Sequence, residues 1–503
     1  MSASVAGSPA GPPRVVIIGG GITGLAAAWE LEGPSRSGAL GVDLFESSDR
    51  VGGPIRSDVT SGHVLEGGPD CFLSTKPGAI ELCEELGLSG SLIGVRPSAG
   101  RAFIYRDGRL HRIPALLGPG RRSAVRALAS TTLFSRAGKF RMLAGGALVW
   151  LRPIHADDRS ALGPQLRSRF GDEAVDWMLE PLVSGVHPAP LEILSASAVA
   201  GVLPSRWVVG RSPPTMVRPP SPGPVAPGSP PSVRLPAGPF LSLREGLEQL
   251  PRTLAAQLSG AAVHLRTRVR EVRPEGERYA VALDDGRNVL ADGVVFAVPP
   301  PVASQLLAGG FPTAAGHLKE IRMESLGVVG AVFDRSDVPL PLDGSGILVP
   351  RRSGLPVSAF TWLSAKWDRP GAGPEEIALR VFLRSDPGRT DPPSEAEWLA
   401  LAREGLRAVM GITAAPRFAT VFAHRAALAW YEVGHVERVR EVRRILGDGS
   451  GVELAGASYD GLGIPDAIRS GREAARRIRA RVERRSPPGL PKRPVGEPLR
   501  SGA

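Results

Sequence analysis

The sequence predicts an α/β fold built on a parallel sheet, and three observations near the N-terminus support it. The apolar run Val15-Val16-Ile17-Ile18 has the length and β-branched content of a buried parallel strand. The following segment 25–29, LAAAW, favours a helix, and a glycine-rich turn joins the two. A second apolar strand, 42–45, comes after the helix and ends at an acidic residue.

The turn has the pattern Gly19-x-Gly21-x-x-Gly24, which is typical of a Rossmann-like dinucleotide site. The first glycine permits a tight turn, the second lets a pyrophosphate approach the backbone, and the third lets helix and strand pack closely. Glu46 follows the second strand, where an acid accepts a hydrogen bond from a ribose hydroxyl and repels a 2′-phosphate. We therefore expect a dinucleotide other than NADP.

A second glycine pair, in Arg50-Val51-Gly52-Gly53, predicts another close approach of backbone to the cofactor. The whole run 14–57 resembles the opening of FAD-dependent oxidases of the amine oxidase, carotenoid desaturase and protoporphyrinogen oxidase superfamily, which implies FAD as the cofactor. The resemblance assigns cofactor contacts here to Gly19, Gly20, Gly21, Ile22, Thr23, Gly24, Glu46, Ser47, Arg50, Gly52, Gly53, Pro54 and Ile55.

Length and composition limit the number of domains and the possible membrane and metal sites. The 503 residues, 42% of them hydrophobic, can hold two or three domains with real cores. Two cysteines, Cys71 and Cys83, show no metal-site spacing and indicate a reduced compartment. The first 13 residues lack the features of a secretory signal and predict a flexible leader. The apolar stretch Met142–Leu151 is about half of the roughly twenty residues that a membrane span requires.

The net charge of +11 is concentrated near the C-terminus, where residues 469–503 hold eleven Lys or Arg against three Glu. A solvated basic tail and contact with acidic lipid head groups both fit this charge. Nucleic acid is not expected as a partner, because no aromatic and basic groove pattern accompanies the charge.

The segment 62–88 predicts a turn at Gly67-Gly68-Pro69 and an amphipathic helix from about Pro77 to Gly87. Its EGGPDCFL run resembles the second cofactor-facing loop of protoporphyrinogen oxidases, which assigns Gly68, Pro69, Asp70 and Cys71 to the cofactor site.

The stretch 108–156 has no acidic residue and interleaves Arg and Lys with apolar residues. Such helices suit either the bilayer interface or a substrate domain with a positive rim, and both are left open. The segment 180–195 predicts a loop in which Gly185 fits the family pattern, whereas His187 stands where the family has an aromatic residue. The Pro-rich stretch 203–239 predicts disorder.

Order resumes at Phe240 with a predicted helix, followed by an alternating strand over 263–269. The family's equivalent strand rejoins the nucleotide domain, and the resemblance places a backbone group near Val269 against the adenine. Strands at 279–283 and 289–290 flank a hairpin turn, and a buried strand over 292–299 leads to Ala297 at the cofactor.

Residues 310–440 predict a mixed sheet, with strands at 325–333, 346–349, 358–363 and 377–383, and a helix over 395–410 capped by Ser394. The segment 424–439 resembles the family's segment before the last cofactor loop, and its His435 is the one histidine considered for a place near the flavin.

The final unit is a strand at Val452 that turns through glycines into a helix over 466–484, whose N-terminus would stabilise negative charge on a reduced flavin. Its LAGASYDGLGI run closely resembles protoporphyrinogen oxidases and assigns Gly456, Ala457, Leu462, Gly463 and Ile464 to the cofactor.

The resemblance implies an amine oxidase/p-hydroxybenzoate hydroxylase-like fold: a Rossmann-like FAD-binding domain, a mixed α+β substrate domain and a helical membrane-associated domain. We expect the domains 14–92 with 240–309 and 441–484 (FAD), 93–202 (helical), 310–440 (substrate), the insertion 203–239, and the basic tail 485–503.

The activity implied is oxidation of protoporphyrinogen IX to protoporphyrin IX by three hydride transfers to FAD, with dioxygen as acceptor, in tetrapyrrole biosynthesis. No catalytic side chain and no metal are expected. The substrate residues implied are Arg101, Gly185, Leu326 and Ser345, although the family's propionate-binding arginine aligns with Ala102 and its ring-packing Phe with Ser345.

Two other functions stay open. The first is a flavoenzyme of the same fold that acts on another apolar substrate, such as coproporphyrinogen, a carotenoid or an amine. The second is an FAD-carrying protein without turnover. The resemblance also implies a cytoplasmic protein at the periphery of the cytoplasmic membrane, and it allows a homodimer.

Overall fold

A computed structural model describes residues 12–114, 121–199, 208–209, 235–236, 238–369, 373–385, 391–447 and 450–485. The leader 1–13, the Pro-rich stretch 203–239 and the tail 485–503 lie almost wholly outside these residues. Predictions made for them are therefore not taken further.

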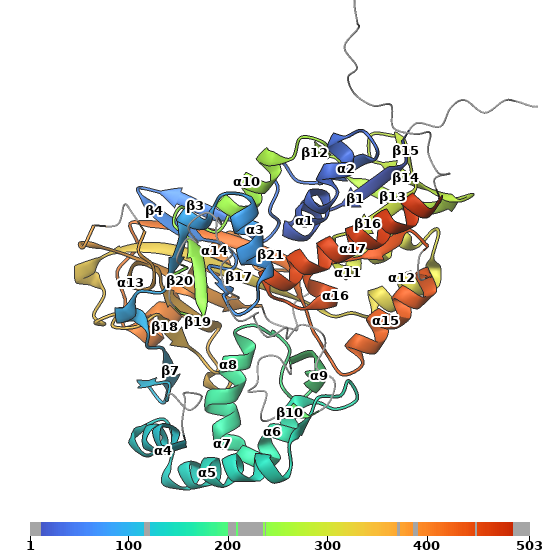
Figure 1. The fold of residues 1–503 in the computed structure, drawn as a ribbon. Helices are drawn as coiled ribbons and strands as arrows, with labels where there is room; N and C mark the ends of the chain where they lie inside the picture. The colour runs from blue at the N-terminus through green and yellow to red at the C-terminus, as the bar shows by residue number, and fades with distance from the viewer. Residues whose placement is uncertain are drawn as a thin grey trace, which may run out of the picture.

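A five-stranded parallel sheet forms the upper part of the molecule in Figure 1, and segments from both ends of the chain build it. The first predicted strand lies at its centre, and all four of its residues Val15–Ile18 are buried. Because both faces of this sheet are covered, its strands are apolar runs, as predicted. In spatial order the strands are β12 (Ala262–His264), β2 (Gly41–Phe45), β1 (Arg14–Ile18), β16 (Gly293–Phe296) and β22 (Val452–Leu454).

The first and last helices of this sheet, α1 and α17, pack directly against each other (Figure 1). Their approach requires Gly471, since a Cβ there would lie 2.1 Å from the carbonyl oxygen of Thr23. The helices around the sheet are α1 (Ile22–Glu30), α2 (Glu32–Arg36), α3 (Gly78–Glu85), α10 (Gln249–Gln257), α11 (Pro300–Leu307), α12 (Pro312–Lys319), α15 (His435–Leu446), α16 (Ala457–Asp460) and α17 (Ile464–Arg485).

The single strand predicted over 263–269 is wrong. The chain forms β12, turns at Leu265 and Arg266, and begins the separate strand β13 (Val269–Glu275). Arg266 has a φ of +50°, in the left-handed region, and this ends the alternation. The two predicted hairpin strands are confirmed as β14 (Arg278–Leu283) and β15 (Asn288–Ala291). β14 pairs antiparallel with β13 on one side and with β15 on the other.

A seven-stranded sheet forms the left part of Figure 1, and it contains the four strands predicted between 325 and 383. The capped helix is confirmed as α14 (Glu395–Gly405), where Ser394 and Glu397 form a capping box. The strands in order are β21 (Phe418–Ala429), β17 (Met323–Asp334), β20 (Glu376–Arg384), β19 (Val357–Trp362), β18 (Gly346–Leu348), β7 (Phe103–Arg106) and β8 (Arg109–Arg112).

Two more of the sheets are small. One is the hairpin of β3 (Ser57–Thr60) and β4 (His63–Glu66), and the other joins β5 (Phe72–Leu73), β11 (Phe240–Leu243) and β6 (Leu92–Gly94).

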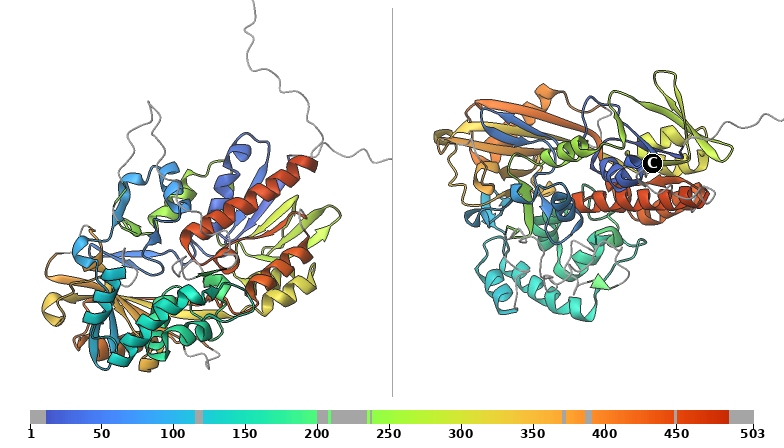
Figure 2. Two further views of the ribbon diagram at one scale, coloured as in Figure 1. Left: turned by 60° about the horizontal axis from the view of Figure 1, so that its bottom comes forward. Right: turned by 45° about the horizontal axis from the view of Figure 1, so that its top comes forward.

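The helical region forms the lower part of Figure 1, and Figure 2 shows it from two further sides. The loop predicted over 180–195 is partly wrong, because Glu180–Ser184 continues the preceding helix as α8. No helix among the described residues is both long and apolar enough to span a bilayer. The helices are α4 (Arg121–Ser130), α5 (Arg136–Leu151), α6 (Leu162–Phe170), α7 (Asp172–Ala174), α8 (Glu180–Ser184) and α9 (Ala196–Val199).

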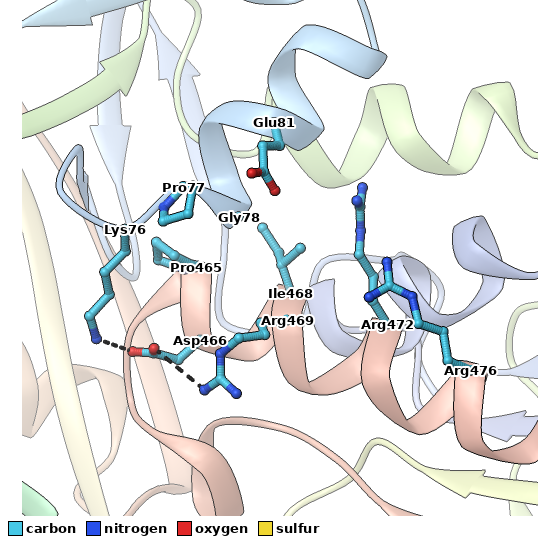
Figure 3. Close-up of a pocket in the computed structure, with 10 residues that line it drawn as sticks. All are labelled: Lys76, Pro77, Gly78, Glu81, Pro465, Asp466, Ile468, Arg469, Arg472 and Arg476. Atoms are coloured by element: carbon cyan, nitrogen blue, oxygen red, sulfur yellow. Dashed lines mark hydrogen bonds and ion pairs between the residues drawn. The ribbon is translucent and has the colours of Figure 1, made fainter. Parts of the chain in front are cut away.

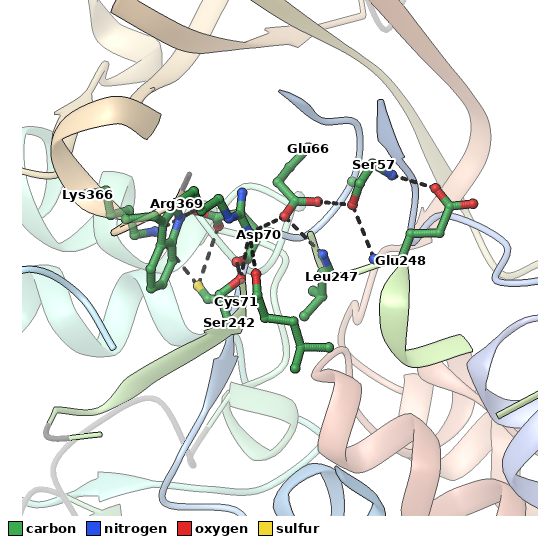
Figure 4. Close-up of polar contacts among 12 residues, drawn as sticks. Ser57, Glu66, Asp70, Cys71, Ser242, Leu247, Glu248, Lys366 and Arg369 are labelled. Carbon is green, nitrogen blue, oxygen red and sulfur yellow. Dashed lines mark hydrogen bonds and ion pairs between the residues drawn. The ribbon is translucent and has the colours of Figure 1, made fainter. Parts of the chain in front are cut away.

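A buried ion network ties the loop before β5 to the seven-stranded sheet (Figure 4). The carboxylate of Asp70 accepts hydrogen bonds from Lys366 Nζ at 2.7 Å and from Trp367 Nε1 at 3.1 Å, and Arg380 Nη2 lies 2.9 Å away. Burial alone would raise the pKa of Asp70, but Arg380 and Lys366 outweigh it and hold that pKa well below its ordinary value. Asp70 therefore stays charged.

We expect Asp70→Asn to lower the free energy of unfolding by about 3–5 kcal/mol, because it leaves buried cations without their partner. The matched control is Asp343→Asn, which breaks the half-exposed pair with Arg101 and should cost about 1 kcal/mol or less. Urea unfolding of the two purified variants measures the difference. Equal losses would contradict a structural role for this network.

Candidate functional site

The first glycine turn leaves open space at the N-terminus of α1. A Cβ on Gly24 would lie 1.9 Å from the carbonyl oxygen of Gly19, so this position needs glycine for packing. A Cβ on Gly21 would meet nothing within 4 Å. Gly21 precedes the first residue of α1, and no side chain caps the helix and no acid lies in its first turn. Free N–H groups beside open space fit the pyrophosphate of a dinucleotide.

Glu46 lies beside this turn, at the carboxyl end of β2. Its Oε2 accepts a hydrogen bond from the N–H of Gly20 at 2.7 Å, and its Oε1 accepts one from the N–H of Ser48 at 2.8 Å. Ser47 Oγ lies 3.4 Å from the same oxygen. The carboxylate is thus held at the edge of the sheet where a ribose is expected.

The second glycine pair packs on the first turn. The N–H of Gly52 donates to the carbonyl oxygen of Gly20 at 2.8 Å. Arg50 holds this segment by donating to the carbonyl oxygens of Gly53 at 2.5 Å and Ile55 at 3.3 Å. Burial is the main cause that lowers the pKa of Arg50. The guanidinium also lies 3.4 Å from Glu248 Oε1, so its contacts are with the protein.

The loop 68–71 lies against that segment, since a Cβ on Gly68 would fall 1.9 Å from the carbonyl oxygen of Pro54. Pro69 follows, and Asp70 anchors the loop through the network described above. Burial raises the pKa of the Cys71 thiol to about 12, so it is a poor nucleophile. The described residues contain no cluster of side chains that could hold a metal ion.

The end of β16 and the start of β13 also lie near the first glycine turn. The carbonyl oxygen of Ala297 lies 2.5 Å from the position of a Cβ on Gly19, whose φ is +104°. The N–H of Thr267 donates to the carbonyl oxygen of Glu46 at 2.9 Å, which brings the start of β13 at Val269 close to the acid.

The last glycine loop reaches the first one. A Cβ on Gly456 would lie 3.4 Å from Thr23 Oγ1, within α1. The loop then runs through Leu462 and Gly463 into α17, which begins at Ile464. Turns from the two ends of the chain therefore converge on one space.

A buried cluster of two imidazoles and a phenol holds this last loop, and the sequence did not identify it as a unit. Tyr431 donates through its hydroxyl to the carbonyl oxygen of Ala457 at 2.6 Å and accepts from the N–H of Gly461 at 2.9 Å. Its ring is tilted against that of His435 by 33°, with centroids 4.1 Å apart, and His187 meets it edge-on at 5.8 Å.

Both histidines of this cluster are neutral at neutral pH. Burial, with smaller effects of Lys76 and His435, lowers the pKa of His187 to about 4. Burial also lowers the pKa of His435 to about 4. Burial raises the pKa of Tyr431 well above its ordinary value. The departure of His187 from the family pattern was the sequence signal for this cluster.

Two of the four predicted substrate residues are in contact. Arg101 and Ser345 lie together, because the N–H of Ser345 donates to the carbonyl oxygen of Arg101 at 2.7 Å. The guanidinium of Arg101 pairs with Asp343 at 2.8 Å and is half exposed. Gly185 lies at the end of α8, and Leu326 lies on β17. The roles of all four residues stay predictions.

Comparison with known proteins identifies relatives of this chain. The family model described as flavin containing amine oxidoreductase matches residues 22–479. The chain is 32% identical to a coproporphyrinogen III oxidase of Bacillus subtilis, over 92% of this chain and 97% of that one. It is 29% identical to the human protoporphyrinogen oxidase, over 92% and 97% of the two chains.

Solved structures show the same fold. A protein described as a protoporphyrinogen oxidase from Exiguobacterium superposes with a TM-score of 0.73 at 27% identity, covering 94% of this chain and 99% of that one. A putrescine oxidase superposes with a TM-score of 0.65 at 19% identity, covering 93% and 99%, and indicates the fold alone.

We expect Gly21→Ala to lose most of its bound flavin while the chain keeps its fold, because the added methyl group enters the space left for the pyrophosphate. Gly33→Ala is the matched control, since a Cβ there also meets nothing within 4 Å but lies on α2, away from the turn. The ratio of absorbance at flavin and protein wavelengths measures the loss, and circular dichroism checks the fold. Equal flavin content in the two variants would exclude Gly21 from the site.

Proposed function

The chain belongs to the flavin containing amine oxidoreductase family, as an FAD-dependent oxidoreductase among the porphyrinogen oxidases of haem biosynthesis, and we propose that it oxidises coproporphyrinogen III to coproporphyrin III. The observation that supports this most is near full-length similarity to coproporphyrinogen III oxidases, at 32% identity for the Bacillus subtilis protein and 27% for that of Staphylococcus aureus. The sequence alone favoured protoporphyrinogen IX, which stays the second candidate because of the human relative.

The site supports a reaction in which side chains position the cofactor and the substrate and do not themselves react. Bound FAD supplies the hydride acceptor. The four loops around it, 19–24, 50–55, 68–71 and 456–464, would hold the cofactor. Burial keeps both imidazoles of the His187, Tyr431 and His435 cluster uncharged, and it keeps water away from that side of the last loop. Dioxygen is the proposed electron acceptor.

Recognition of the substrate's carboxylates is also proposed here. Arg101 would release Asp343 and pair with one of these carboxylates instead. Half exposure of both side chains permits this exchange. Ser345 precedes the neighbouring strand β18, and its hydroxyl donates to the carbonyl oxygen of Arg101 at 3.0 Å.

We expect anaerobic coproporphyrinogen III to bleach the flavin about tenfold faster than protoporphyrinogen IX at equal low concentration, a difference worth about 1.4 kcal/mol. Stopped-flow absorbance with the two porphyrinogens and with benzylamine measures the rates. Faster bleaching by protoporphyrinogen IX would select the second candidate. Reduction by the amine alone, or by none of the three, would contradict porphyrinogen oxidation.

We further propose that the helical region contacts anionic lipid at the membrane surface. Helix α5 exposes Phe140 and Leu143, which are 75% and 45% accessible, with Arg136 and Arg141 beside them. The surrounding stretch 108–156 has no acidic residue. Exposed aromatic and basic side chains on one helix are typical of interfacial binding.

We expect Phe140→Asp to lower the fraction of protein that sediments with phosphatidylglycerol vesicles, since it removes an apolar contact and adds repulsion. Val59→Asp is the matched control, because Val59 is 64% exposed on β3, in another part of the molecule. Equal binding by the two variants, or no binding by the unaltered protein, would contradict membrane contact through α5.

A further inference from the structure

A cavity of about 140 Å³ lies between the start of α3 and the first turns of α17 (Figure 3). Charged side chains dominate its walls, and most of the cations already have acidic partners outside it. Arg472 pairs with Glu85 at 2.7 Å, and Arg476 pairs with Glu30 at 2.8 Å. Four more charged side chains line the cavity: Lys76, Glu81, Asp466 and Arg469. Lys76 and Asp466 face each other at one end of it.

Asp466 is a buried acid in the first turn of α17, and its side chain is 4% exposed. The last glycine loop folds around it, because Cβ atoms on Gly461 and Gly463 would lie 3.2 and 2.8 Å from its Oδ2. This carboxylate is therefore fixed at the N-terminus of the helix that follows the flavin loop. An unpaired negative charge there would offset the positive electrostatic potential of the helix N-terminus.

Lys76 supplies the compensating charge from a distant part of the chain. Its Nζ donates to Asp466 Oδ2 at 2.5 Å, whereas Arg469, on the same helix as the acid, is 3.7 Å from the other carboxylate oxygen. Arg469 also lies 3.4 Å from Glu473 and donates to the carbonyl oxygen of Asp460. Lys76 comes five residues after Cys71, so the pair links the loop 68–71 with the loop 456–464.

We propose that Lys76 is a positioning residue that neutralises Asp466, and so leaves the N-terminus of α17 free to stabilise negative charge on the reduced flavin. The proposal deepens the proposed function and rests on its FAD site, but not on which porphyrinogen is the substrate. Lys76 acts here through Asp466 rather than by contact with the reacting atoms. A neutral side chain in place of Asp466 would leave Lys76 no negative charge to compensate.

The test is a cycle of Lys76→Met, Asp466→Asn and the double variant, with Lys76→Arg as the conservative replacement and Arg476→Met as the control from the same cavity. Spectroscopic titration against reference dyes measures the midpoint potential of the bound flavin without any substrate. We expect Lys76→Met to lower that potential, Lys76→Arg to restore it, and Arg476→Met to leave it unchanged. Adding Asp466→Asn to Lys76→Met should return it toward the unaltered value.

An unchanged potential in flavin-loaded Lys76→Met would overturn the proposal, as would a double variant that behaves like Lys76→Met alone. If Lys76→Met loses its flavin, the double variant decides the matter in the same way: recovery of flavin supports the proposal, and continued loss overturns it. Because no porphyrinogen enters the titration, failure of the proposed substrate leaves this test intact.

Discussion

The close packing of α1 against α17 is the constraint on which the rest of the structure depends. Gly471 lets the helix at the end of the chain touch the backbone of Thr23, and Gly456 then lies against the side chain of the same residue. One helix follows the first glycine turn, and the other follows the last. Their contact therefore places both turns around one space, and the parallel sheet beneath holds them there through β1, β16 and β22.

Much of this arrangement could be predicted from the sequence, because local signals were strong. The strand at Val15, the glycine turn and Glu46 follow a spacing that the chemistry of dinucleotide binding demands, and Ser394 with Glu397 forms the cap that its sequence predicts. The break at Arg266 could not be predicted, since alternation over 263–269 fits one strand as well as two. Arg266 has a positive φ, and its N–H donates to the carbonyl oxygen of Ser48, which lies far away in the chain.

The polar contacts of the site were harder to foresee, because they join residues far apart in the chain. Tyr431 holds the loop at Gly461, and Lys76 pairs with Asp466, yet no spacing in the sequence connects either pair. Burial decides the charge of His187 and His435, and burial is a property of the folded chain. Arg101 was identified by resemblance, but its pairing with Asp343 depends on how β7 and β18 meet.

The central claim is that glycine loops from the two ends of the chain bind one FAD together. Hydrogen–deuterium exchange of the apoprotein and of the FAD-loaded protein tests this most directly. The account predicts that FAD slows amide exchange in residues 19–24 and 456–464 alike, with smaller protection over 50–55. Protection confined to the N-terminal loop, with unchanged exchange over 456–464, would contradict it.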